Sequence, residues 1–191
     1  MRVPLRHPIP WVAGRRGVVT SAGGAARARG QSLVEFSLVL VPLFMLVLGI
    51  IQFGLIFNSY VTLTNAAREG ARTGTIYVYN RTLTKAQNDA ARNAAIRDSV
   101  MSSMNLLSTT GPNFSSGTTW TQTATTYANG DIVVTYALPA GIVESDTRTG
   151  QKLTVRLTYH QDLMIPMISS LLPQDSGGRL ALPGEVTMVI N

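Results

Sequence analysis

The chain has 191 residues, a formal net charge of +6 and no cysteine. That length allows one modest domain plus a membrane segment, and the absence of thiols excludes disulfides, thiolate metal sites and thiol catalysis. The positive charge is confined to one end, because residues 1–30 hold six arginines and no acid, whereas residues 31–191 hold ten basic and ten acidic side chains. Nucleic acid is therefore not an expected partner, since the folded part offers phosphates no net positive field.

An apolar segment follows the basic leader. Residues 36–57 carry no charge, and 16 of these 22 residues are Leu, Ile, Val or Phe. As a helix they reach about 33 Å, which is enough to cross a hydrocarbon core of about 30 Å. Insertion of the sixteen apolar side chains is favourable by about 5 to 10 kcal/mol, and Ser37, Pro42 and Gln52 reduce this gain without reversing it. The sequence predicts a transmembrane helix rather than the core helix of a soluble protein.

The distribution of arginines also predicts the orientation of that helix. Six arginines precede the span, whereas only Arg68 and Arg72 follow closely, together with Glu69. The positive-inside rule then places the N-terminus in the cytoplasm and the C-terminal part outside. A cleaved secretory signal peptide fits less well, because the apolar run is too long and residues 58–64 offer no small-residue cleavage site.

Three residues within the span bear on helix shape and packing. Pro42 removes one backbone donor and predicts a kink. Gly49 and Gly54 leave small surfaces at which another helix could approach closely. All three are equally compatible with a helix surrounded by lipid, where Gly and Pro are common, so both interpretations stay open.

Glu35 stands directly before the span and has two interpretations. The sequence of residues 32–35, SLVE, matches a capping box, in which Ser32 caps the helix and Glu35 complements its dipole. Alternatively, a cut after Gly30 would leave a free α-amine at Gln31, one turn from Glu35. A carboxylate costs up to about 3 kcal/mol to submerge, and the amine of a neighbouring subunit would offset that cost. Gly30 suits a scissile position because it accepts an extended backbone.

The residues around this acid resemble a known family. Residues 29–36 read RGQSLVEF, an apolar segment with Pro42 follows, and residues 65–72 read NAAREGAR. In these features the chain resembles the TadE-like proteins of the tight-adherence (Flp) pilus system over about residues 29–72. Residues 159–172 and the final strand are more loosely similar.

The resemblance implies a minor pilin or pseudopilin whose basic leader, residues 1–30, is removed. A prepilin peptidase would cut between Gly30 and Gln31, and Glu35 and Phe36 would set subunit assembly and register. The implied location is the bacterial inner membrane. The implied partners are that membrane, the peptidase, other pilin or pseudopilin subunits, inner-membrane platform proteins and a secretion ATPase. No cofactor is implied.

Beyond the span the helix is expected to continue to about residue 74, where Gly70 and Gly74 mark its end. Residues 31–74 then form a transmembrane and TadE-like helix, and residues 75–191 an extracytoplasmic α+β domain. An apolar stripe on the helix would face that domain or other subunits; its members are Tyr60, Leu63, Ala67 and Ala71.

The rest of the chain predicts an antiparallel sheet packed against helices. A helix is expected at residues 82–105, capped by Thr82 or Thr84, and a polar loop at 108–119. Asn129-Gly130 predicts a tight hairpin turn. The expected strands are 75–80, 118–127, 131–138, 152–160 and 186–190; Ile132, Val134, Tyr136 and Leu138 would share one face of their strand, and Leu153, Val155, Leu157 and Tyr159 one face of theirs.

The apolar residues 163–168, LMIPMI, follow the strand at 152–160. They would form a contact surface, since methionine-rich segments adapt to partners, or core beneath the sheet, and the core interpretation is preferred. His160 is expected on the polar face of its strand with Asp162 nearby. No residue spacing typical of a metal site, a phosphate loop or a catalytic group is found, so the chain is not expected to be an enzyme.

Two other classes of function remain open. The chain would be an uncleaved signal-anchor protein whose outer domain binds a partner, or a membrane-anchored hydrolase with an unrecognised site. The leader is long for a prepilin, and a start at Val18 or Val19 would still retain the arginines beside Gly30.

Overall fold

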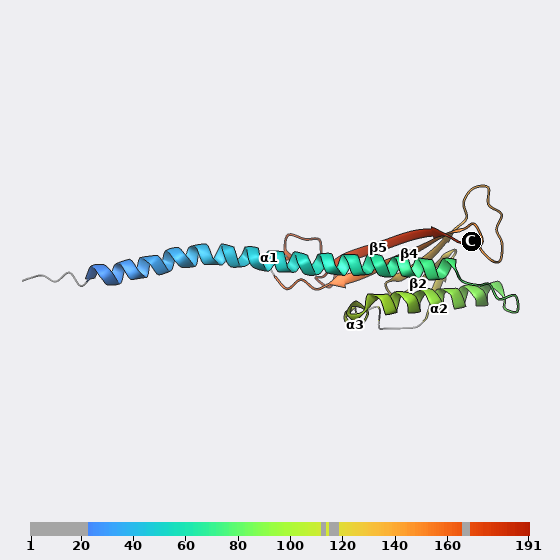
Figure 1. Cartoon of the computed structure of the whole chain (residues 1–191), viewed down its shortest axis with the longest axis horizontal. Helices are drawn as coiled ribbons and strands as arrows, with labels where there is room; N and C mark the ends of the chain where they lie inside the picture. The colour runs from blue at the N-terminus through green and yellow to red at the C-terminus, as the bar shows by residue number, and fades with distance from the viewer. Residues whose placement is uncertain (1–22, 112–113, 115–118, 166–168) are drawn as a thin grey trace, which may run out of the picture. The chain divides into compact units, whose positions relative to one another are not determined.

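A computed structural model describes residues 23–111, 114, 119–165 and 169–191, with side chains from residue 31 onward. In these residues, three helices and a five-stranded antiparallel sheet follow one another along the chain (Figure 1). The α+β class predicted from the sequence is therefore confirmed. The chain divides into two units, residues 1–44 and residues 45–191. Residues 1–22 of the leader and part of the polar loop at 108–119 lie outside the described residues.

The first helix, α1, runs from Gly23 to Thr75 and ends where the sequence predicted. Because it begins at Gly23, Ser32 lies nine residues inside it, and the interpretation of Ser32 as the N-cap is wrong. Arg72 in the last turn complements the helix dipole.

The strand predicted at residues 75–80 is absent, because Thr75 ends α1 and residues 76–80 form a bend and coil. The buried side chain of Asn88 supplies a hydrogen-bond partner in place of a neighbouring strand. Its Oδ1 accepts from the backbone N–H of Asn80 at 2.8 Å and from the hydroxyl of Tyr77 at 3.3 Å.

The second helix, α2, runs from Lys85 to Met104 and packs against the last turns of α1. Thr84 is its N-cap, one of the two predicted candidates, and forms a capping box with Gln87: the Gln87 amide donates to Thr84 Oγ1 at 3.3 Å and Gln87 Oε1 accepts from the Thr84 amide at 2.9 Å. The short helix α3, Leu106–Thr110, begins before the predicted loop and takes up its first residues.

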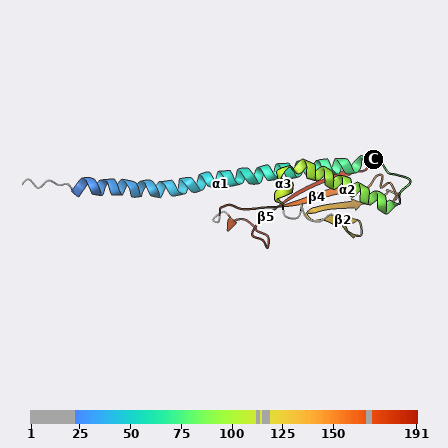
Figure 2. The same ribbon diagram turned by 90° about the horizontal axis from the view of Figure 1, so that it is seen from below.

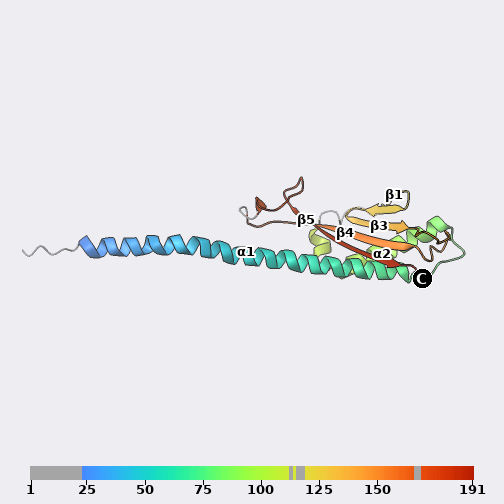
Figure 3. The ribbon, with the colours of Figure 1, turned by 90° about the horizontal axis from the view of Figure 1, so that it is seen from above.

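Five strands pair in chain order as an antiparallel meander (Figure 3). Their bounds are β1 Thr121–Thr123, β2 Thr126–Asn129, β3 Ile132–Ala137, β4 Lys152–Gln161 and β5 Leu180–Val189.

Three details of the sheet differ from the prediction. The strand expected at 118–127 folds back at Ala124, whose φ of 53° makes a hairpin without glycine or asparagine. The next turn is centred one residue later than predicted, because Asn129 pairs with Ile132 and Gly130 takes a φ of 59°. Finally, β5 begins at Leu180 rather than at residue 186.

The hydrophobic core lies between the helices and one face of the sheet. Alternation in β3 and β4 is as predicted, with the exception of Leu138, which follows β3 and is exposed. Tyr60 is 48% exposed and is not part of the buried stripe of α1. The buried core residues include Leu63, Ala66, Ala67 and Ala71 of α1, Ile96, Val100 and Met104 of α2, and the inward side chains of β3 and β4.

A buried ion pair ties α2 to the loop before β4. Arg148 donates to both carboxylate oxygens of Asp89, at 2.7 and 2.8 Å, and to Gln151 at 3.0 Å. Its guanidinium also lies 4.2 Å from the ring centre of Tyr136. Burial alone would lower the pKa of Arg148, but the hydrogen bonds and charge of Asp89 outweigh it and raise the pKa, while burial raises the pKa of the Tyr136 hydroxyl.

We predict that Asp89→Asn destabilises the folded domain by about 3 to 5 kcal/mol, because it leaves Arg148 buried without its counter-charge. Asp98→Asn is the matched control, since the side chain of Asp98 is exposed and its loss is expected to cost less than about 1 kcal/mol. Urea unfolding of the full chain in detergent measures both, followed by the fluorescence of Trp120 in a Trp11→Phe background, since Trp11 is the second tryptophan of the sequence. Equal midpoints for the two variants would contradict a structural role for the buried pair.

Close packing of α1 against the domain generates a second prediction. A Cβ on Gly74 would collide with Leu153 Cδ2 and lie 2.7 Å from Ile96 Cδ1, whereas a Cβ on Gly54 meets nothing within 4 Å. Gly74→Ala should therefore cost about 1 to 3 kcal/mol of domain stability through overpacking, and Gly54→Ala should leave it unchanged. The same urea unfolding experiment checks both, and an unaltered Gly74→Ala midpoint would contradict this packing.

Candidate functional site

The predicted processing and assembly residues lie near the start of α1. Gln31 Nε2 donates to Glu35 Oε1 at 3.0 Å, one turn along the helix, and both side chains are exposed. Among the described residues no Lys or Arg forms an ion pair with Glu35. Its carboxylate therefore has a neutral partner within its own chain and remains accessible to a cation from elsewhere.

The helix surface after Glu35 is apolar and exposed. Phe36 and the Leu, Val and Phe side chains that follow it to Phe44 contact little of their own chain. In the described residues one helix segment, Gln31–Thr75, is long and apolar enough to cross a membrane, with a window of mean hydropathy 2.6 that is 6% buried. This segment supports a single-pass membrane protein, and the low burial is unlike that of a soluble core helix.

The remaining predicted site residues occupy different environments along α1. Gly30 is helical, so the uncut chain does not present it in an extended form. Pro42 lies inside the helix, which continues through it. Gly49 is half-buried, and Gly54 is exposed with open space around it. The open surface at Gly54 fits close approach of another helix and fits lipid equally well.

Gln52 is a residue whose importance the sequence analysis missed. Its side chain is 1% exposed, and its Oε1 accepts the backbone N–H of Met164 at 3.0 Å. The sequence does show an amide side chain within an apolar run. Such a group requires a hydrogen-bond partner where it is buried. Met164 is 74% exposed, so the preferred interpretation of this segment as core is wrong for that residue; residues 166–168 lie outside the described residues.

His160 has different partners from the one expected. Its Nδ1 lies 2.5 Å from Asp175 Oδ2 and its Nε2 lies 3.5 Å from Asp131 Oδ1, whereas Asp162 pairs with Arg179 at 2.8 Å. The pKa of Asp175 is lowered, chiefly by the hydrogen bond from the Arg179 amide and also by His160. This group joins β4 to the turns beside it, and in the described part of the chain no cluster of three or more metal-binding side chains occurs.

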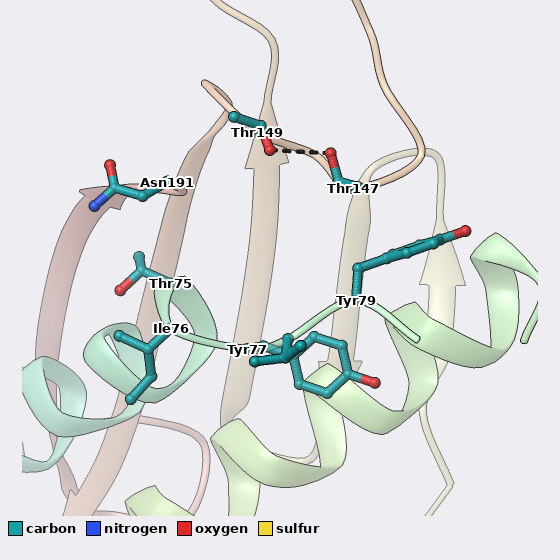
Figure 4. Close-up of a pocket in the computed structure, with 8 residues that line it drawn as sticks. Thr75, Ile76, Tyr77, Tyr79, Thr147, Thr149 and Asn191 are labelled. Carbon is teal, nitrogen blue, oxygen red and sulfur yellow. Dashed lines mark hydrogen bonds between the residues drawn. The ribbon is translucent and has the colours of Figure 1, made fainter. Parts of the chain in front are cut away.

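A cavity of about 380 Å³ lies where α1 ends (Figure 4). Thr147 and Thr149 face each other across its rim with hydroxyls 2.9 Å apart. Its described lining consists of apolar and uncharged polar side chains; the lining residues are Thr75, Ile76, Tyr77, Val78, Tyr79, Thr147, Thr149 and Asn191.

Comparison with known proteins gives one family match, and it covers most of α1. A family model described as TadE-like protein matches residues 30–72. The match begins at Gly30, contains Glu35 and Pro42, and ends in the last turns of α1, so the resemblance predicted from the sequence is confirmed. Searches of curated proteins and of solved structures give no match. The helix with its exposed acid is thus a TadE-like segment, and residues 73–191 lie outside the match.

Proposed function

We propose that this protein is a minor pilin-like or pseudopilin subunit of a tight-adherence pilus or of the machine that assembles it. The observation that carries the proposal is the TadE-like match on a helix whose apolar surface is exposed and whose acid, Glu35, has no described cationic partner. The role is mechanical rather than catalytic. The protein stays in the bacterial inner membrane, N-terminus inside, until platform proteins and a secretion ATPase move it into a helical stack.

Processing would occur at Gly30. A peptidase cleft takes an extended substrate, and Gly30 lies within α1, so the first turns must unwind before cleavage. Glycine is about 1 kcal/mol less favourable than alanine inside a helix, which makes this position easier to unwind than its neighbours. The basic leader would hold the scissile bond at the cytoplasmic surface, within reach of a membrane-bound prepilin peptidase.

Cleavage would supply the cation that Glu35 lacks. The new α-amine at Gln31 carries a positive charge, and a neighbouring subunit could place its own amine beside this carboxylate. Such a pair fixes the axial register of two apolar helices, because a shift of one turn would leave both charges unpaired in a medium of low dielectric constant. Phe36 lies beside the pair and is exposed for contact with the same neighbour.

The processing step predicts a mature chain that begins at Gln31. Intact-mass analysis of the protein extracted from the membranes of its host measures this directly. Gly30→Leu should retain the leader, because the side chain obstructs an extended fit in the cleft. Gly24→Leu, a leader glycine away from the cut, should be processed normally. A wild-type mass that includes residues 1–30 would instead support an uncleaved signal anchor with a binding domain.

The register role predicts that Glu35→Ala inserts into the membrane normally but enters assemblies at least about tenfold less, which corresponds to about 1.4 kcal/mol per subunit. Glu69→Ala is the matched control, since Glu69 is on the same helix and pairs with Arg72 of its own chain at 3.0 Å. Immunoblots of membrane and sheared pilus fractions quantify both variants. Normal incorporation of Glu35→Ala would exclude the register role.

A further inference from the structure

The chain between β4 and β5 contacts the apolar part of α1. In Figure 3 this segment extends beyond the end of the sheet. The backbone N–H of Met164 donates to Gln52 Oε1 at 3.0 Å. Met164 and Ile165 also enclose, with α1, a cavity of about 150 Å³ whose helix residues are Leu48, Ile51, Gln52 and Leu55. All of these residues belong to the unit formed by residues 45–191.

The position of Gln52 along α1 determines the depth of this contact. Phe57 is the last residue of the apolar run, and Gln52 precedes it by five residues, or about 7.5 Å of helix. Leu48 lies about 13.5 Å from Phe57 on the same scale. If residues 36–57 cross a bilayer, the groups that bind Gln52 or line a cavity with Leu48 are at hydrocarbon depth. Met164 and Ile165 must then be there as well.

Polar contacts mark the level at which this segment would leave water. Ser59, two residues beyond the span, donates its hydroxyl to Gln161 Oε1 at 2.7 Å. The next residue, Asp162, pairs with Arg179 at 2.8 Å. Between Asp162 and Asp175 the sequence contains no charged residue. The charges therefore bracket an uncharged stretch on both sides.

Two described apolar side chains of that stretch lack cover within their own chain. Met164 is 74% exposed and Leu171 is 80% exposed. Two backbone donors nevertheless have partners that need no water: Met164 N–H binds Gln52, and Ser169 N–H binds the Ile165 carbonyl at 3.0 Å. Irregular backbone is tolerated at membrane depth where its polar groups are satisfied by protein.

We propose that the segment between β4 and β5 inserts Met164, Ile165 and Leu171 into the lipid leaflet that adjoins the folded domain, with phospholipid acyl chains covering their exposed surfaces. The inference rests on α1 crossing the membrane and is independent of any role in a pilus. The inserted segment gives the domain a second membrane contact beside α1. Gln52, hydrogen-bonded to Met164, joins the two contacts.

Site-directed fluorescence tests this insertion, and the natural chain has no cysteine to remove. Met164→Cys and Leu171→Cys, each in the full chain, are labelled with an environment-sensitive fluorophore and reconstituted in phosphatidylcholine vesicles. Phe53→Cys is the control within the span. Val143→Cys is the control in the domain, since Val143 is apolar and exposed but distant in sequence from this segment.

We expect lipids brominated in the upper part of the acyl chain to quench the labels at Met164 and Leu171 nearly as strongly as at Phe53. Aqueous iodide should quench only the label at Val143. The proposal is overturned if iodide quenches Met164 and Leu171 as it does Val143. A second result also overturns it: at high protein density, and only there, neither brominated lipid nor iodide quenches the labels at Met164 and Leu171. That result would mean that a second copy of the chain covers this surface. Two independently labelled positions guard against one variant that misfolds.

Discussion

The structure depends on one helix, α1, whose two parts require different surroundings. Up to about Phe57, α1 presents large apolar side chains outward and buries almost none of them. From Ser59 onward the same helix buries small residues, Ala66, Ala67 and Ala71, against α2 and the sheet. The first part needs lipid or other helices around it, because exposure of that much apolar surface to water is unfavourable, whereas the second part is a component of an ordinary protein core.

Small residues make the second part possible. Gly70 lies where a Cβ would approach Val100 to 2.6 Å, and Gly184 of β5 lies where a Cβ would approach Leu63 to 3.0 Å. The ribbon viewed from below shows α2 and the sheet beside this end of α1 (Figure 2). The TadE-like match ends at residue 72. It therefore includes both the exposed apolar surface and most of the helix face that holds the domain.

Local patterns in the sequence predicted much of this architecture. The apolar run defined α1, the period of two defined β4, and Thr84 was one of the two caps predicted for α2. The errors have local causes too. The motif at Ser32 matched a capping box in the middle of a longer helix, and the hairpin at Ala124 has no glycine or asparagine to reveal it.

Contacts between distant parts of the chain were beyond those patterns. Periodicity assigns a face to a residue but does not say which partner lies opposite, so it did not reveal the pairing of Asp89 with Arg148 or of Gln52 with Met164. The start of β5 was missed because Pro183 and Gly184 weaken the strand signal. Proline is tolerated there because β5 is at an edge of the sheet. The position of Glu35 was evident from sequence, whereas its partner belongs to another molecule in our proposal.

The most direct test of that proposal is a distance between molecules. Solid-state NMR would be recorded on assemblies in which this subunit carries ¹³C and every other subunit carries ¹⁵N. Our account predicts a dipolar coupling between the side-chain carboxyl carbon of Glu35 and an N-terminal amine nitrogen of a neighbour. Assemblies that contain this subunit but show no such coupling, with Glu35 instead bonded only within its own chain, would contradict it.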